Sequence, residues 1–150
     1  VLALSRQGLP ALRKEAGENL CERGGYILAE AEGEPRATLM ASGSEVEIAL
    51  AARDTLQADG IPTRVVSLPC WEAFDAQPQD YRDKVLGQGT VRVAVEAAST
   101  FGWERYVGLE GAVIGMTRFG ESAPAGDLYE HFGITANAVA EAVKTRLGGA

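Results

Sequence analysis

Short apolar runs alternate along this chain with longer amphipathic stretches. The apolar runs are rich in β-branched residues and predict strands at residues 26–31, 36–41, 63–68, 91–95 and 112–116. The amphipathic stretches predict helices at residues 45–59, 78–85, 103–106 and 127–132, and a last helix capped by Thr135. Strand, helix and strand at this spacing form right-handed crossovers. We therefore expect an α/β fold, a three-layer sandwich around a mostly parallel sheet.

The helix expected at residues 45–59 carries sequence signals at both ends. Ser44 with Glu47 fits a capping box, and Ser42 with Glu45 offers a competing register. Gly60 stands where a left-handed C-terminal cap is expected. These signals predict a helix that begins near Ser44 and ends before Gly60.

The first 23 residues differ in character from the rest of the chain. Residues 1–4 are apolar but too few to form a strand without sheet neighbours, and residues 11–23 are polar and charged. We expect a fragment of a larger enzyme, cut just upstream of a ligand-binding strand end. Residues 1–23 are then the tail of a preceding domain with its linker, and residues 24–150 form the next domain.

Charge and composition disfavour several classes of partner. The chain has 150 residues, a net charge of −7 and a pI near 4.8, which argues against nucleic acid and against an anionic membrane surface. No apolar run is long enough to span a bilayer. Cys21 and Cys70 lack the spacing of a zinc site, and such low cysteine use favours a reducing compartment, so we expect a cytoplasmic protein. Cys70, next to Trp71, is expected to be buried.

Arg6 is the candidate substrate-binding residue. Ser5, Arg6 and Gln7 follow the apolar residues 1–4. A guanidinium at a strand end can make two parallel charge-assisted hydrogen bonds to a phosphate and stays protonated. The alternative is a surface arginine in an interdomain salt bridge. Ser5 and Gln7 are expected to support the loop rather than to contact a ligand.

Two further polar features lie where open α/β sheets bind ligands. Ser42, Gly43 and Ser44 precede a helix N-terminus, which is a generic anion site for a nucleotide phosphate, although we expect their hydroxyls to cap the helix instead. Glu96 follows a strand at its carboxyl end, where a carboxylate can act as a general acid or base. Because no second titratable partner is evident, we favour a hydrogen-bonded or interface role for Glu96.

The remaining conspicuous side chains are expected to be structural. Residues 119–124 read Phe-Gly-Glu-Ser-Ala-Pro, which indicates either a lid or, as we favour, a fixed turn that packs on a neighbouring domain. Trp103 and Tyr106 are expected on the same buried or subunit-facing surface. His131 is expected to be solvated rather than catalytic.

Several short motifs follow one another in a characteristic order. They are Leu4-Ser5-Arg6-Gln7 with Leu9-Pro10, Arg23-Gly24-Gly25-Tyr26, Ala41-Ser42-Gly43-Ser44-Glu45-Val46, Arg64-Val65-Val66-Ser67-Leu68-Pro69, Phe74-Asp75, Tyr81-Arg82, Val95-Glu96-Ala97, Tyr106-Val107-Gly108 and Phe119-Gly120-Glu121-Ser122-Ala123-Pro124. Together they resemble the transketolase family over nearly the whole chain, from the end of its middle, pyrimidine-binding domain through its C-terminal domain. The resemblance implies a five-stranded sheet with one antiparallel strand. We expect that strand to be residues 26–31, paired with residues 36–41.

The resemblance also implies a function. Transketolases use thiamine diphosphate with Mg²⁺ or Ca²⁺ to move a two-carbon ketol unit from a ketose phosphate to an aldose phosphate, and they act as homodimers. By this resemblance Arg6 binds the sugar phosphate, while the missing N-terminal and middle domains hold the cofactor, the metal and the acid–base histidines. No stretch here resembles the family's Gly-Asp-Gly…Asn metal and pyrophosphate motif. The fragment alone is therefore expected to bind no cofactor and to be inactive.

Two other functions remain as alternatives. The first is a non-catalytic regulatory or ligand-binding α/β module of a sibling thiamine-diphosphate enzyme, with its site at Ser44 or at the strand ends near Ser67 and Glu96. The second is a sibling enzyme with the same three-domain plan, such as a dihydroxyacetone synthase or a deoxyxylulose phosphate synthase.

Overall fold

The computed structural model of the chain describes residue 5, residues 7–14 and residues 17–148. The strand expected at residues 1–4 and the side chain of Arg6 lie outside the described residues. The elements, in chain order, are η1 (Leu20–Arg23), β1 (Tyr26–Ala29), β2 (Ala37–Ala41), α1 (Glu45–Ala58), β3 (Thr63–Ser67), α2 (Trp71–Asp75), α3 (Gln79–Leu86), β4 (Val91–Ser99), α4 (Glu104–Val107), β5 (Ala112–Met116), α5 (Ala125–Phe132) and α6 (Ala136–Gly148). Within the described part of the chain, no helix combines the length and the apolar character that crossing a bilayer requires.

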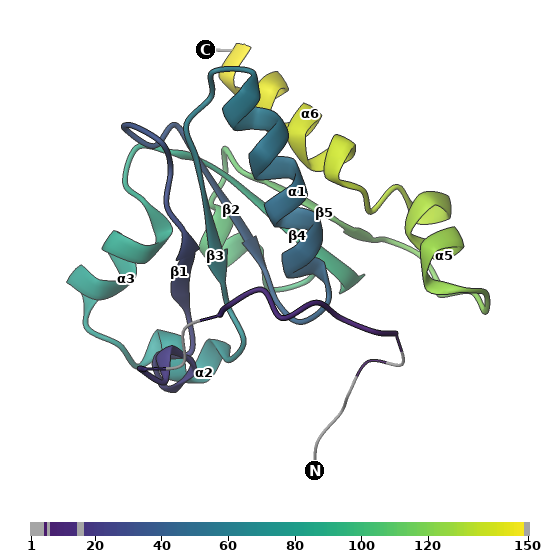
Figure 1. The fold of residues 1–150 in the computed structure, drawn as a ribbon, viewed down its shortest axis with the longest axis horizontal. Coiled ribbons are helices and arrows are strands. Elements are labelled where there is room, and N and C mark those ends of the chain that lie inside the picture. The colour runs from purple at the N-terminus through teal and green to yellow at the C-terminus, as the bar shows by residue number, and fades with distance from the viewer. Residues whose placement is uncertain (1–4, 6, 15–16, 149–150) are drawn as a thin grey trace.

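The strands form one five-stranded sheet in the order β1-β3-β2-β4-β5, with only β1 antiparallel to its neighbour. Helices α1 and α6 pack side by side on one face, while α2, α3 and α4 contribute to the core on the other (Figure 1). The central strands are covered on both faces, since Val65 and Val66 are each fully buried and belong to opposite cores. This confirms the expected three-layer α/β sandwich with a mostly parallel sheet and one antiparallel strand.

The predicted hairpin between the first two strands is wrong. Strand β1 is antiparallel at the sheet edge, but it pairs with β3, with Tyr26 opposite Ser67, and not with β2. The connection between β1 and β2 crosses the end of β3 and places β2 on the far side of it. The backbone N–H of Arg36 donates to the carbonyl of Pro62, which fixes that crossing where β3 begins. Sequence proximity alone had suggested the hairpin.

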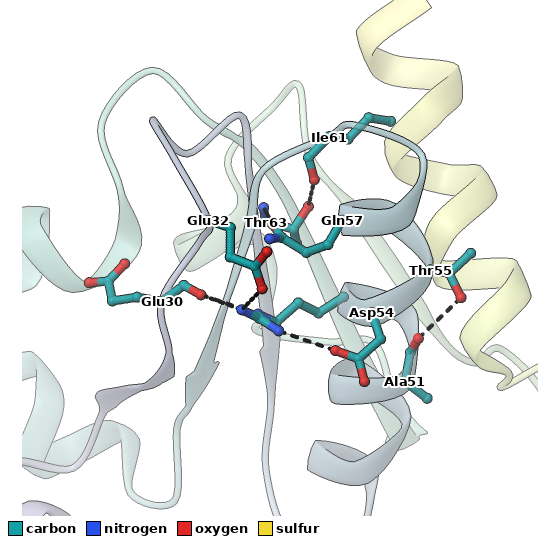
Figure 2. A network of polar contacts seen from close by, with 9 residues as sticks. Glu30, Glu32, Ala51, Asp54, Thr55, Gln57, Ile61 and Thr63 are labelled. Atoms are coloured by element: carbon teal, nitrogen blue, oxygen red, sulfur yellow. Dashed lines mark hydrogen bonds and ion pairs between the residues drawn. The ribbon is translucent and has the colours of Figure 1, made fainter.

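Polar contacts made by Arg53 of α1 hold this crossing connection (Figure 2). The guanidinium donates to the backbone carbonyl of Glu30 and forms ion pairs with Glu32 at 3.7 Å and Asp54 at 3.1 Å. The Arg53 side chain is only 16% exposed, so its bonds to a carbonyl are partly shielded from water. The connection is thus fastened to α1, which lies over the neighbouring strands.

Helix α1 begins and ends close to the predicted positions, but its N-terminal cap differs from the prediction. The N–H groups of Gly60 and Ile61 donate to the carbonyls of Gln57 and Leu56, and Gly60 has φ of +75°, which is the Schellman arrangement. At the other end the Ser44 side chain makes no capping bond to the backbone, so the predicted capping box is wrong. Ser44 already has helical dihedral angles and donates instead to its neighbour's carboxylate.

Cys70 is not placed as the sequence predicted. Cys70 is exposed, as is Cys21, and both are free thiols. Cys70 lies in extended backbone just before α2, a helix that the hydrophobic pattern did not predict. The next residue, Trp71, contacts the rings of Trp103 and Tyr106 edge to face. The expectation that Cys70 is buried is therefore wrong.

Candidate functional site at the carboxyl ends of β2 and β4

Strands β2 and β4 are parallel neighbours whose connections leave in opposite directions. From β2 the chain passes through α1 to β3 on one side, and from β4 it passes through α4 to β5 on the other. The carboxyl ends of two such strands flank a crevice, the usual ligand position in an open α/β sheet. The register pairs Ala41 with Val95, so the next residues, Ser42 and Glu96, come together there.

Ser42 and Glu96 are joined directly, and a second carboxyl group lies beside them. The Ser42 hydroxyl donates to Glu96 Oε2 at 3.0 Å. Burial raises the pKa of the Glu96 carboxyl, the bond from Ser42 opposes this, and the nearby Glu45 raises the pKa further. The expectation of a hydrogen-bonded Glu96 is confirmed, but the expectation that no titratable group lies near it is wrong. Glu45, the first residue of α1, is that partner.

Glu45 is only 4% exposed and accepts two short hydrogen bonds. The hydroxyls of Ser44 and of Tyr129, on α5, each donate to Glu45 Oε1 at 2.6 Å. Burial raises the pKa of the Tyr129 phenol, and the bond to Glu45 raises it further. A negatively charged ligand at this helix end would meet a carboxylate, so the geometry does not support the nucleotide-phosphate site considered for Ser44.

The N-terminal segment reaches the same cluster. Gln7 Nε2 donates to the Tyr129 hydroxyl at 3.3 Å, across 122 positions of the sequence. A pocket of about 390 Å³ opens here, and its lining includes Gln7, Glu45, Met116, Leu128, Tyr129 and Phe132. Gln7 thus supports the segment, as expected. Ser5 is exposed, and the phosphate-binding role of Arg6 remains a prediction because Arg6 lies outside the described residues.

The lining of this pocket includes Gly120 and Glu121 of the segment 119–124, but not Trp103, Tyr106 or His131. Trp103 and Tyr106 are buried in the core beneath α2 and α4, which fits one of the two placements expected for them. His131 is exposed and contacts Arg118 through Nε2. Residues 119–124 are all exposed, and the Phe119 side chain is 97% exposed. Glu45 and Tyr129 are the two site residues that the sequence did not single out.

The described residues do not gather the side chains that usually hold a metal ion. Among them no group of three or more histidine, cysteine, aspartate or glutamate side chains is arranged to hold an ion. The described part of the chain therefore offers no metal site built from side chains of these four kinds.

Comparison with known proteins agrees with the fold. Residues 24–135 match the family model described as the transketolase-like TK C-terminal domain. A transketolase of Sinorhizobium medicae is 58% identical over 147 residues, covering 96% of this chain and 21% of that protein. This chain thus spans about a fifth of the length of such relatives.

Solved structures give the same result. Transketolase from Leishmania mexicana superposes with a TM-score of 0.78 at 42% identity, covering 85% of this chain and 18% of that one. A mutant transketolase from Pichia stipitis, in complex with fructose 6-phosphate, superposes with a TM-score of 0.78 at 35% identity, covering 86% of this chain and 18% of that one. The chain belongs to the transketolase family, and its residues 24–135 match the C-terminal domain of that family.

Proposed function

We propose that this chain is the C-terminal part of a thiamine-diphosphate-dependent enzyme that transfers a two-carbon ketol unit from a ketose phosphate to an aldose phosphate. The observation that carries the proposal is 58% identity to a transketolase across 96% of the chain. A relative bound to fructose 6-phosphate supports the substrate class. Within that enzyme, the chain's own contribution is a substrate-phosphate anchor at Arg6 and packing against other domains.

Arg6 is assigned the anchor role from its chemistry and its motif. A guanidinium offers a phosphate two parallel hydrogen bonds in a fixed plane. The chain is otherwise acidic, with a net charge of −7, so an anionic substrate needs a local cation. The bond from Gln7 to Tyr129 ties the segment next to Arg6 to the strand ends where ligands bind in such folds.

The test is ketol transfer by the full-length enzyme and its Arg6→Ala variant. Losing a hydrogen bond between charged groups costs roughly 1.5–3 kcal/mol, so kcat/KM for fructose 6-phosphate should fall about tenfold or more. The same measurement with fructose, which carries no phosphate, should change little. Lys14→Ala serves as the control, because it removes a nearby exposed basic residue and leaves Arg6 in place. Equal losses with both sugars, or none with either, would remove Arg6 from the phosphate site.

The cofactor and its metal belong, in this proposal, to domains outside this chain. Thiamine diphosphate supplies the carbanion chemistry when bound there, and the isolated chain is inactive. Addition of thiamine diphosphate and Mg²⁺ to the isolated chain should produce no ketol transfer. Activity of the chain alone would refute this division of labour.

Exposed apolar side chains support contact with the remaining domains or with the second subunit of a homodimer. Phe101 is 85% exposed and Phe119 is 97% exposed, although large apolar side chains are normally covered. Both follow the carboxyl ends of neighbouring strands, β4 and β5. We propose that the rest of the enzyme covers them. A cytoplasmic location remains part of the same proposal.

A further inference from the structure

The Tyr129 hydroxyl lies at the centre of a polar chain that joins three distant parts of the sequence. It has Glu45 Oε1 at 2.6 Å, Ser44 Oγ at 3.3 Å and Gln7 Nε2 at 3.3 Å. A phenol has one proton to donate and lone pairs to accept with. The short bond to the Glu45 carboxylate takes the proton, so the Gln7 amide donates to the phenol oxygen. The bonds from Tyr129 to Glu45 and from Gln7 to Tyr129 thus have defined directions.

The inner end of this chain is rigid. Glu45 is buried and begins α1, and the Ser44 hydroxyl holds the same carboxylate oxygen at 2.6 Å. The Tyr129 ring packs on the core shared by α1 and α6, and its backbone carbonyl accepts from the N–H of Ile134. The phenol oxygen is therefore a fixed point on the domain.

The outer end has few other attachments. Ser5, Gly8, Leu9 and Pro10 are all exposed. Among the described residues before Leu12, Gln7 alone has a side-chain hydrogen bond to the described part of the domain. Leu12 packs on the core further along the chain. Among the described residues, Gln7 is thus a direct sequence neighbour of Arg6 that a side-chain hydrogen bond ties to the domain.

We propose that Tyr129 is a positioning residue whose hydroxyl, oriented by Glu45, holds Gln7, the sequence neighbour of Arg6, and so favours binding of the substrate phosphate. This inference rests on the proposed role of Arg6. It gives the C-terminal domain a part in substrate affinity without contact between Tyr129 and substrate. Loss of the hydroxyl should weaken the phosphate contact and leave an unphosphorylated sugar unaffected.

The test uses the full-length enzyme with Tyr129→Phe, which keeps the ring and removes the hydroxyl. The KM for fructose 6-phosphate should rise roughly two- to tenfold, the effect of one net hydrogen bond, with kcat and the kinetics with fructose unchanged. Tyr81→Phe is the matched control. It also deletes a hydroxyl, one that donates to the Gly25 carbonyl at 2.9 Å in the other core, and it should leave both sugars unaffected.

A double-mutant cycle separates positioning from a general structural effect. Gln7→Ala should raise the KM as Tyr129→Phe does, and the combined variant should be no worse than either alone, because both remove the same bond. In an Arg6→Ala background, Tyr129→Phe should add nothing. Full additivity of Gln7→Ala and Tyr129→Phe, or equal effects on both sugars, overturns the inference.

The two proposals fail in different ways. If Arg6→Ala leaves the preference for the phosphorylated sugar intact, the proposed anchor is wrong. If Arg6→Ala abolishes that preference while Tyr129→Phe and Gln7→Ala leave it intact, only the positioning role is wrong.

Discussion

Replacing Gly24 by alanine should destabilise the chain more than any other single methyl addition at a comparable backbone position. Gly24 joins the N-terminal connector to the domain, with φ of +74°, and its carbonyl accepts from the N–H of Cys70. A Cβ at this position would lie 2.2 Å from the Cys70 carbonyl oxygen and 2.3 Å from the Phe74 nitrogen. Both atoms belong to the backbone around α2, so no side-chain rotation can relieve the overlap.

The magnitude has two parts. An alanine in left-handed backbone costs roughly 1–2 kcal/mol, and overpacking a closed site adds about 1–3 kcal/mol. Gly60→Ala isolates the first part, because Gly60 has φ of +75° and a Cβ there would meet nothing within 4 Å. The Gly24→Ala variant should therefore lose at least about 1 kcal/mol more than Gly60→Ala.

The assay is urea unfolding of the 150-residue chain, followed by far-ultraviolet circular dichroism, with the free energies extrapolated to water. Equal destabilisation by Gly24→Ala and Gly60→Ala would refute the reasoning, because the whole loss would then come from the left-handed backbone conformation and none from the overlap. A larger loss at Gly60 would refute it as well.

Three further measurements test the core and the carboxyl pair. The pKa of Glu96 is raised in the folded state, so the folded state binds this proton more tightly than the unfolded state does. The free energy of unfolding that this group contributes therefore falls as the pH rises from near 4.5 through the raised pKa. The effect of Glu96→Gln on the free energy of unfolding should therefore be more favourable at pH 7 than at pH 4. Both free energies are measured by urea unfolding. An effect of the substitution that is the same at both pH values would contradict the raised pKa. Leu56→Ala should cost about 2–5 kcal/mol, because Leu56 is fully buried between helix and sheet. Leu109→Ala, at a fully exposed leucine, should stay within about 0.5 kcal/mol, and a comparable loss at both leucines would argue against the described core.

The residues of the candidate site come from segments that are far apart in the sequence. Ser42 and Glu96 were both singled out, Ser42 because it precedes a helix N-terminus and Glu96 because it follows a predicted strand at its carboxyl end. Their closeness depends on β2 and β4 being neighbours, although α1, β3, α2 and α3 lie between them in the chain. Tyr129 lies 84 positions along the chain from Glu45. The pattern of its helix indicates only that one face is apolar. No local signal relates such residues.

The sequence by itself determined the elements: the positions of the predicted strands and of most helices, the end of α1 at Gly60, and the family. Local periodicity can do this because burial of one face of a strand or helix is recorded in the spacing of its apolar residues. The tertiary structure decided that β1 pairs with β3, that Cys70 faces solvent, and that Glu45, Glu96 and Tyr129 meet. These outcomes depend on the side to which each connection turns and on the packing of distant surfaces, which residue spacing along the chain does not encode.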